Sequence, residues 1–141
     1  MSDVVRISEA ANLGIHTMVL LALDSGRPMT VRRAAEQLPV SENHLAKVLQ
    51  RLSRAKLVTS TRGPSGGFML SRDAAQITLL EVFEAIEGSV DSKGCLLGRP
   101  RCQGTCFLGD FLSRAQAEFR AQLEKTRLSD AAKAFRGSSH P

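Results

Sequence analysis

The chain has 141 residues, 43% of them hydrophobic, a formal net charge of +5, and neither Trp nor Tyr. This length suits one domain with a single core, or one domain with an appendage, and the absence of a long apolar run argues against a transmembrane helix. The polar, charged start does not resemble a secretory signal, so we expect a cytoplasmic protein, in which clustered cysteines more often bind metal or sense redox state than form stable disulfides.

Residues 8–24 are predicted to form the first helix. Ser8 is a favourable N-cap, and the second half of the segment is apolar on nearly all sides, so this helix should be largely buried. Asn12 and His16 lie one helical turn apart and share a face. From the residues alone, a histidine satisfied at a helix interface is the simpler reading of His16, and a metal ligand is the alternative.

Two short helices separated by a three-residue break come next. Thr30 can cap the first, Pro39 ends it, and Ser41 can cap the second, which runs from residue 42 to about residue 56. The second helix has a polar, basic outer face, and its apolar positions recur at helical spacing. These core positions are Leu45, Val48, Leu49 and Leu52. The pattern is typical of a helix-turn-helix, although a generic helical hairpin would share it.

Residues 57–71 contain two alternating segments around a Gly-Pro turn, which predicts a β-hairpin. A helix-turn-helix followed directly by a hairpin is a winged helix, whose second helix enters the major groove of DNA. We expect Lys47 and Asn43 to read base edges. Arg51 and Arg54 should touch phosphates, and Arg62 could enter a narrow minor groove. The expected DNA-binding residues are Ser41, Asn43, His44, Lys47, Arg51, Arg62, Gly66 and Gly67, the two glycines permitting close backbone approach.

The charge is concentrated in this region. Residues 27–72 carry nine Lys or Arg and two Glu, a net +7, whereas the remainder carries ten basic and twelve acidic residues, a net −2. Such a segment is the electrostatic footprint of a nucleic-acid site, and a solvated basic face is the alternative.

Two further helices are predicted. Thr78 and Glu81 form a capping box for the first, which should stop at Gly88. The second is a long amphipathic helix over residues 107 to about 127. Because little of the chain remains to cover its apolar stripe, we expect that stripe to meet a second copy. The stripe, and hence the expected dimer interface, is Leu108, Phe111, Leu112, Ala115, Phe119 and Leu123.

All three cysteines, Cys95, Cys102 and Cys106, lie within twelve residues of a Gly-rich loop that also contains Arg99 and Arg101. Three thiolates suit zinc or an iron–sulfur cluster, and the arginines would offset their negative charge. Incidental cysteines are the alternative. Either metal site needs a fourth ligand. For this ligand His16 is chemically better than Asn12, and Asp110 is a weaker candidate.

The chain resembles the Rrf2 family of bacterial winged-helix transcription regulators, which includes iron–sulfur and nitric-oxide sensors. The resemblance rests on "ISEAANLGIHTMVLLAL", "LAKVLQRLSRAKLVTSTRGPSGGFML", "ITLLEVFEAIEG", the three-cysteine loop and "TRLSDA". It implies a homodimer on a partly palindromic operator, with a cluster in many members. Positions matching Asn12 and His16 supply ligands in some members, sometimes from the partner subunit. The cysteine gaps, six and three residues, are less even than is usual in cluster-binding members, and some members bind no cluster.

We therefore expect a mainly α fold with a small β-hairpin. Residues 1–88 would form a winged helix-turn-helix domain, 89–106 a cysteine-rich cluster-binding loop, 107–135 a dimerisation helix and C-terminal segment, and 136–141 a disordered tail. The expected function is regulation of transcription by a homodimer whose affinity for double-stranded DNA responds to a [2Fe–2S] or [4Fe–4S] cluster sensing redox state, iron–sulfur status or nitric oxide.

The alternative is a cluster-free regulator controlled by cysteine oxidation, zinc or a protein partner. No nucleophile–base pair, phosphate-binding loop or carboxylate pair points to an enzyme.

Overall fold

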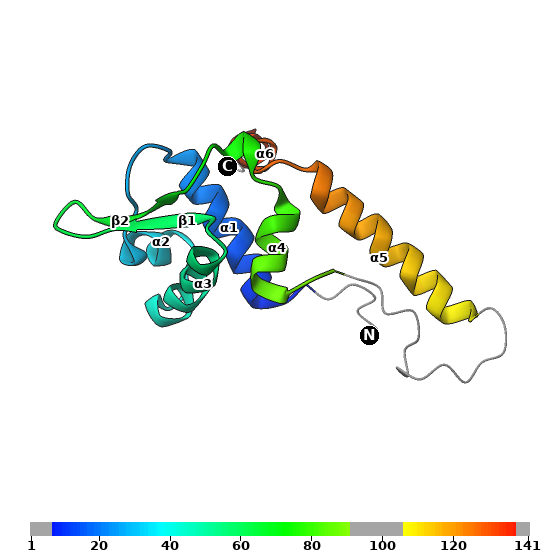
Figure 1. The fold of residues 1–141 in the computed structure, drawn as a ribbon. Helices are drawn as coiled ribbons and strands as arrows, with labels where there is room; N and C mark the ends of the chain where they lie inside the picture. Colours follow the sequence, from blue (N-terminus) through cyan, green and yellow to red (C-terminus); the bar gives the residue numbers. More distant parts are fainter. Residues whose placement is uncertain (1–6, 91–105, 138–141) are drawn as a thin grey trace.

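The computed structural model describes residues 7–90 and 106–137, and Figure 1 shows their arrangement. The predicted fold class is confirmed, since the described residues are mostly helical with one antiparallel hairpin. The elements are α1 (Glu9–Leu23), α2 (Val31–Gln37), α3 (Glu42–Arg54), β1 (Val58–Thr61), β2 (Gly67–Leu70), the 3-10 turn η1 (Ala74–Gln76), α4 (Leu79–Glu87), α5 (Phe107–Lys125) and α6 (Leu128–Gly137).

Side-chain caps fix where the helices of the winged domain begin. The hydroxyls of Ser8, Thr30 and Ser41 each accept a hydrogen bond from the backbone N–H three residues later, as predicted. The capping box of α4 is also present, with Thr78 and Glu81 each accepting from the other's backbone. These local side-chain caps mark where each helix begins.

Glu81 also pairs with Arg72 from the segment after β2. Partial burial alone would raise the pKa of Glu81, but hydrogen bonds from Thr78 and Arg72, together with the charge of Arg72, hold it below its ordinary value of 4.5. Because the folded pKa is the lower one, the carboxylate stabilises the fold above the unfolded value. That contribution is lost as the pH falls through the folded pKa.

Thr78→Ala should therefore lower the free energy of unfolding by about 1 kcal/mol, because the first turn of α4 loses a hydrogen-bond acceptor. Urea denaturation measures this difference. Thr59→Ala, on the exposed side of β1, is the matched control and should change the midpoint little. Equal midpoints for Thr78→Ala and wild type would show that the cap does not stabilise α4.

The core forms where α1 meets α3, α4 and α6. The four predicted apolar positions of α3, Leu45, Val48, Leu49 and Leu52, are all buried, and they pack with Met18 of α1 and Leu57 before the wing. Burying these side chains against α1 fixes the rotation of α3 about its axis. Its polar face is consequently turned outward.

The hairpin is short and joined to the turn before α2. Strand β1 pairs with β2 in the register Val58↔Leu70 to Thr61↔Gly67. Beside it, the backbones of Met29 and Phe68 exchange two hydrogen bonds of 2.9 and 2.8 Å, which anchors the base of the hairpin to the helix-turn-helix. The loop between the strands projects from the body beyond α2 and α3 (Figure 1).

The C-terminal part differs from the expected single helix. Helix α5 ends at Lys125 because Thr126 is extended and its carbonyl accepts from the N–H of Leu79 at 3.0 Å. The N–H of Leu128 donates to Ile77 at 2.8 Å, and α6 begins there.

Helix α6 was not among the predicted elements. It packs on α1, with Leu128 and Ala132 buried, so the C-terminal segment shares the core of the winged domain. It continues through Arg136 and Gly137, which we had expected in a disordered tail, and residues 138–141 lie outside the described part.

Candidate nucleic-acid interface and cysteine site

The outer face of α3 is exposed and basic. Ser41, Asn43 and Lys47 are exposed, whereas His44 is half-buried, and the Ser41 hydroxyl also caps the helix by accepting from the N–H of His44 at 3.2 Å. The start of α3 thus offers hydroxyl, amide and ammonium groups to a ligand. This set can hydrogen-bond both phosphates and base edges.

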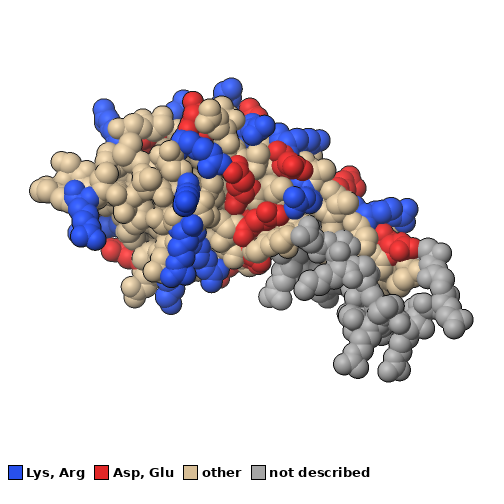
Figure 2. Space-filling view, viewed as in Figure 1, with Lys and Arg blue, Asp and Glu red and all other residues tan. Residues whose placement is uncertain are grey.

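Positive charge continues from α3 into the hairpin. The exposed cations of this stretch are Lys47, Arg51, Arg54, Lys56 and Arg62. In Figure 2 a group of Lys and Arg side chains lies over this side of the molecule, whereas acidic and basic side chains are mixed over α4 and α5. A polyanion would therefore be attracted to the α3 and hairpin side.

Arg51 has a contact within the chain. Its Nη1 donates to the backbone carbonyl of Ile86, in the last turn of α4, at 3.2 Å. The side chain is otherwise exposed, so the phosphate contact that we expected for Arg51 stays a prediction.

The hairpin loop is shaped by glycines. Gly63 has φ of +105°, and its carbonyl accepts from the N–H of Gly66 at 2.9 Å, which closes a turn next to the exposed Arg62. A Cβ on Gly66 would lie 2.4 Å from the carbonyl oxygen of Thr61, and one on Gly67 would lie 2.6 Å from the carbonyl oxygen of Met29. The close backbone approach that we expected toward DNA is thus made within the chain, and contact of these glycines with DNA is still a prediction.

Of the three cysteines, the structure describes only Cys106, which is half-buried at the N-cap of α5. Its Sγ accepts from the N–H of Gly109 at 3.2 Å. The sulfur thus lies at the first turn of a 19-residue helix, where it already accepts one hydrogen bond. Cys95 and Cys102 lie outside the described residues, and within residues 7–90 and 106–137 no three His, Cys, Asp or Glu form a metal-binding group.

His16 and Asn12 are both exposed on one face of α1. The Nδ1 of His16 lies 2.8 Å from the backbone carbonyl of Asn12, which can only accept, so Nδ1 carries the proton. In the neutral ring this leaves the lone pair on Nε2, directed away from the helix. Histidines that bind a metal commonly donate the other ring N–H to a carbonyl or carboxylate in this way, which orients the ring. Asp110 is also exposed, in the first turn of α5.

The apolar stripe of α5 divides into two parts. Phe119 and Leu123 pack against the core of the same chain, and Phe119 meets Phe83 of α4 edge-to-face with ring centroids 5.4 Å apart. Leu108 and Phe111 are each 50% exposed in the first half of the helix. Leu112 and Ala115, which lie between these two parts of the stripe, are half-buried. In Figure 1 this first half extends beyond the body.

A winged helix with a basic recognition face is typical of DNA-binding proteins. Comparison with known families identifies the family. The Rrf2 family model, described as iron-dependent transcriptional regulator, matches residues 7–134. The chain belongs to the Rrf2 family. This is a family of transcriptional regulators and not a class of enzymes. The match confirms the resemblance to the Rrf2 family that was stated from the sequence.

Known relatives of this Rrf2 regulator include IscR proteins. The HTH-type transcriptional regulator IscR of Sodalis glossinidius is 35% identical over 100 residues, covering 70% of this chain and 60% of that protein. The IscR of Escherichia coli O1:K1 / APEC is 34% identical over 100 residues, covering 70% and 61%. The matched part of the chain thus spans about 60% of the length of these curated relatives.

Two solved structures show the same fold. CymR (YrzC), the global cysteine regulator of B. subtilis, superposes with a TM-score of 0.80 at 24% identity, covering 92% of this chain and 98% of that one. The T. potens IscR gives a TM-score of 0.81 at 22% identity, covering 97% and 93%. In the described part of our Rrf2 regulator, no helix is long and apolar enough to cross a membrane.

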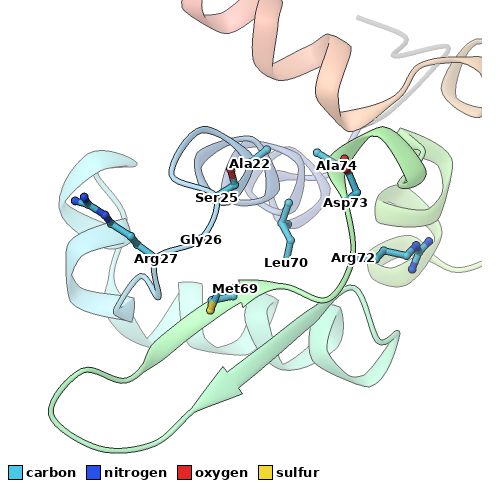
Figure 3. A pocket seen from close by; sticks show the side chains of 9 residues that line it. All are labelled: Ala22, Ser25, Gly26, Arg27, Met69, Leu70, Arg72, Asp73 and Ala74. Atoms are coloured by element: carbon cyan, nitrogen blue, oxygen red, sulfur yellow. The ribbon is translucent and has the colours of Figure 1, made fainter.

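Sequence reasoning missed two features of this Rrf2 regulator. One is the ion pair of Arg120 with Glu84, at 2.7 Å between α5 and α4. The other is an open pocket of about 280 Å³ lined by the end of α1 and by the segment from β2 to η1 (Figure 3). In Figure 3 the side chains of Arg27 and Arg72 point away from this pocket. Both features join segments distant in the sequence, and no local pattern signals them.

Proposed function

We propose that this Rrf2 regulator is a homodimer that binds partly palindromic double-stranded DNA through α3 and the hairpin. The observation that carries the proposal is the exposed, basic face of α3, which continues to Arg62 while the apolar face is locked into the core. Lys47 and Asn43 would reach base edges in the major groove, and Arg62 would enter the minor groove.

Lys47→Ala and Arg62→Ala should each weaken binding to the selected operator by about 1–3 kcal/mol if the side chains contact bases. Wild-type protein would first select an operator from a pool of random duplexes. Fluorescence anisotropy then measures each variant at fixed salt. Lys133→Ala, at an exposed position of α6, is the matched control for loss of one positive charge. Unchanged affinity in both test variants would contradict the proposed surface.

The first half of α5 would form the dimer interface. Leu108 and Phe111 expose apolar surface there, and the half-buried Leu112 and Ala115 continue the same strip. Burying such a strip against its own copy is favourable, and an isologous contact gives the two-fold symmetry that matches a palindrome. Phe119 and Leu123, which we had also assigned to this interface, contribute to the fold of the single chain.

We further propose that Cys95, Cys102 and Cys106 hold an iron–sulfur cluster with His16 as the fourth ligand, and with Asn12 as the alternative. Support comes from the N-cap position of Cys106 and from the bond that orients the His16 ring. When bound, the cluster would supply redox chemistry or sensitivity to nitric oxide. The start of α5 lies away from α1 in Figure 1, so His16 of the partner subunit is a possible donor as well as His16 of the same chain.

A cluster-free regulator is the second candidate. One observation favours it: the fold match to the B. subtilis global cysteine regulator is as good as the match to the T. potens IscR. Under this candidate the same thiols would respond by oxidation, by binding zinc with His16, or by contact with a protein partner. Iron and sulfide analysis of anaerobically purified protein separates the two candidates, because only the first requires both elements.

A further inference from the structure

The last two turns of α4 lie between the recognition helix and the proposed dimer helix. On one side, Arg51 of α3 donates to the carbonyl of Ile86 at 3.2 Å. On the other side, Arg120 of α5 donates to the Glu84 carboxylate at 2.7 Å, and Phe119 packs edge-to-face on Phe83. Within four consecutive residues, α4 therefore contacts both helices whose relative placement would decide how a dimer fits its DNA.

Arg51 supplies a hydrogen-bond donor to the C-terminal end of α4. The last carbonyls of a helix have no partner within the helix, and a cation near them is favourable. The last turn of α4 contains no basic residue of its own. The guanidinium of Arg51, 35 residues earlier in the chain, supplies both the donor and the positive charge.

The same turn is held from the side of the loop that follows it. The backbone N–H of Val90 donates to Glu84 at 3.3 Å, on the carboxylate oxygen that also accepts from Arg120. The N–H of Gly88 donates to the Glu84 carbonyl at 2.9 Å. The end of α4 is thus fixed by groups from α3, from α5 and from its own exit.

We propose that Arg51 is a positioning residue, which sets the angle of the recognition helix relative to α5 by bonding the end of α4, and this role replaces the phosphate contact expected from the sequence. The inference rests on the proposed function, because it assigns the basis of operator recognition. Arg54 lies three residues further along α3, is exposed and ends the helix. It is the matched arginine for a phosphate contact.

The test compares Arg51→Ala with Arg54→Ala in the full chain, on the operator selected by wild-type protein. Loss of a phosphate contact lowers the slope of log K against log salt by about 0.9. We expect Arg54→Ala to show this loss. Arg51→Ala should instead weaken binding by roughly 3- to 30-fold with an unchanged slope. It should also discriminate less between operators whose half-sites are moved apart or together by one base pair.

Hydrogen exchange without DNA supplies an independent measurement. Arg51→Ala should speed exchange of the Gly88 and Val90 amides, whereas Arg54→Ala should not. If Arg51→Ala does not fold, Arg51→Gln replaces it, since the amide can still donate to a carbonyl but carries no charge. A slope reduced by about 0.9 in either Arg51 variant, with exchange unchanged, would overturn the proposal. If wild-type protein selects no duplex, the proposed function fails, and the exchange result alone still decides whether Arg51 holds α4.

Discussion

Leu108→Asp combined with Phe111→Asp should convert the proposed dimer into monomers. Both side chains are 50% exposed in the single chain, so a symmetric interface would remove about half of each from water in both subunits. At roughly 1.5–3 kcal/mol for full burial of one such side chain, four half-burials contribute about 3–6 kcal/mol, before the added cost of burying a carboxylate. The dimer dissociation constant should rise by about 10²–10⁴-fold.

Sedimentation equilibrium over a range of protein concentrations measures this constant. Phe135→Asp is the matched control, because Phe135 is also 50% exposed but lies on α6. Phe119→Asp would be a poor test, since Phe119 packs on Phe83 inside one chain and its loss would disturb the fold itself. A double variant that dimerises with the wild-type constant would place the interface elsewhere.

Cys102→Ala should abolish the visible absorption of anaerobically reconstituted protein, because two thiolates and one imidazole would remain for a site that needs four ligands. His16→Ala should shift or destabilise the absorption, since it removes a nitrogen already oriented by the carbonyl of Asn12. His44→Ala on α3 is the control for loss of a histidine and should leave the spectrum as in wild type.

Two results would contradict the proposed ligand set. Retention of the full spectrum and iron content in Cys102→Ala would remove Cys102 from the ligand set. An unchanged spectrum in both His16→Ala and Asn12→Ala would show that neither residue is the fourth ligand. Asp110, exposed in the first turn of α5, would then be the remaining candidate.

The parts of the fold that depend on neighbouring residues could be predicted from the sequence. Ser8, Thr30, Ser41 and Thr78 cap helices because a side-chain oxygen can reach an amide three residues away, whatever the rest of the chain does. The buried positions of α3 follow from helical spacing in the same way.

The parts of the fold that depend on distant residues could not be predicted from the sequence. The break between α5 and α6 contains neither Gly nor Pro, and it arises because Thr126 and Leu128 pair with the backbone beside Thr78. The contact of Arg51 with Ile86 likewise spans 35 residues. From the sequence, Gly66 and Gly67 were expected to let the backbone approach DNA. The structure shows that the backbones of Thr61 and Met29 occupy the space beside them, and this packing cannot be seen in the sequence.

The same limit applies to the candidate site. Residue chemistry predicts a recognition surface and a thiol site separately, because Lys47 and Arg62 carry charge and cysteines favour soft metals. The proposed control of α3 by the thiols would need tertiary contacts such as those at the end of α4, and these contacts span residues distant in the sequence.

The most direct test of a cluster-controlled regulator is the operator affinity of one anaerobic preparation, measured before and after assembly of the cluster at the same salt concentration. Iron and sulfide are quantified in both samples. We expect the coloured form to differ from the colourless form by about 5- to 150-fold in affinity for the selected duplex, the range of a typical allosteric coupling. A protein that stays colourless after reconstitution, or that binds the operator equally well with and without the cluster, would contradict the account.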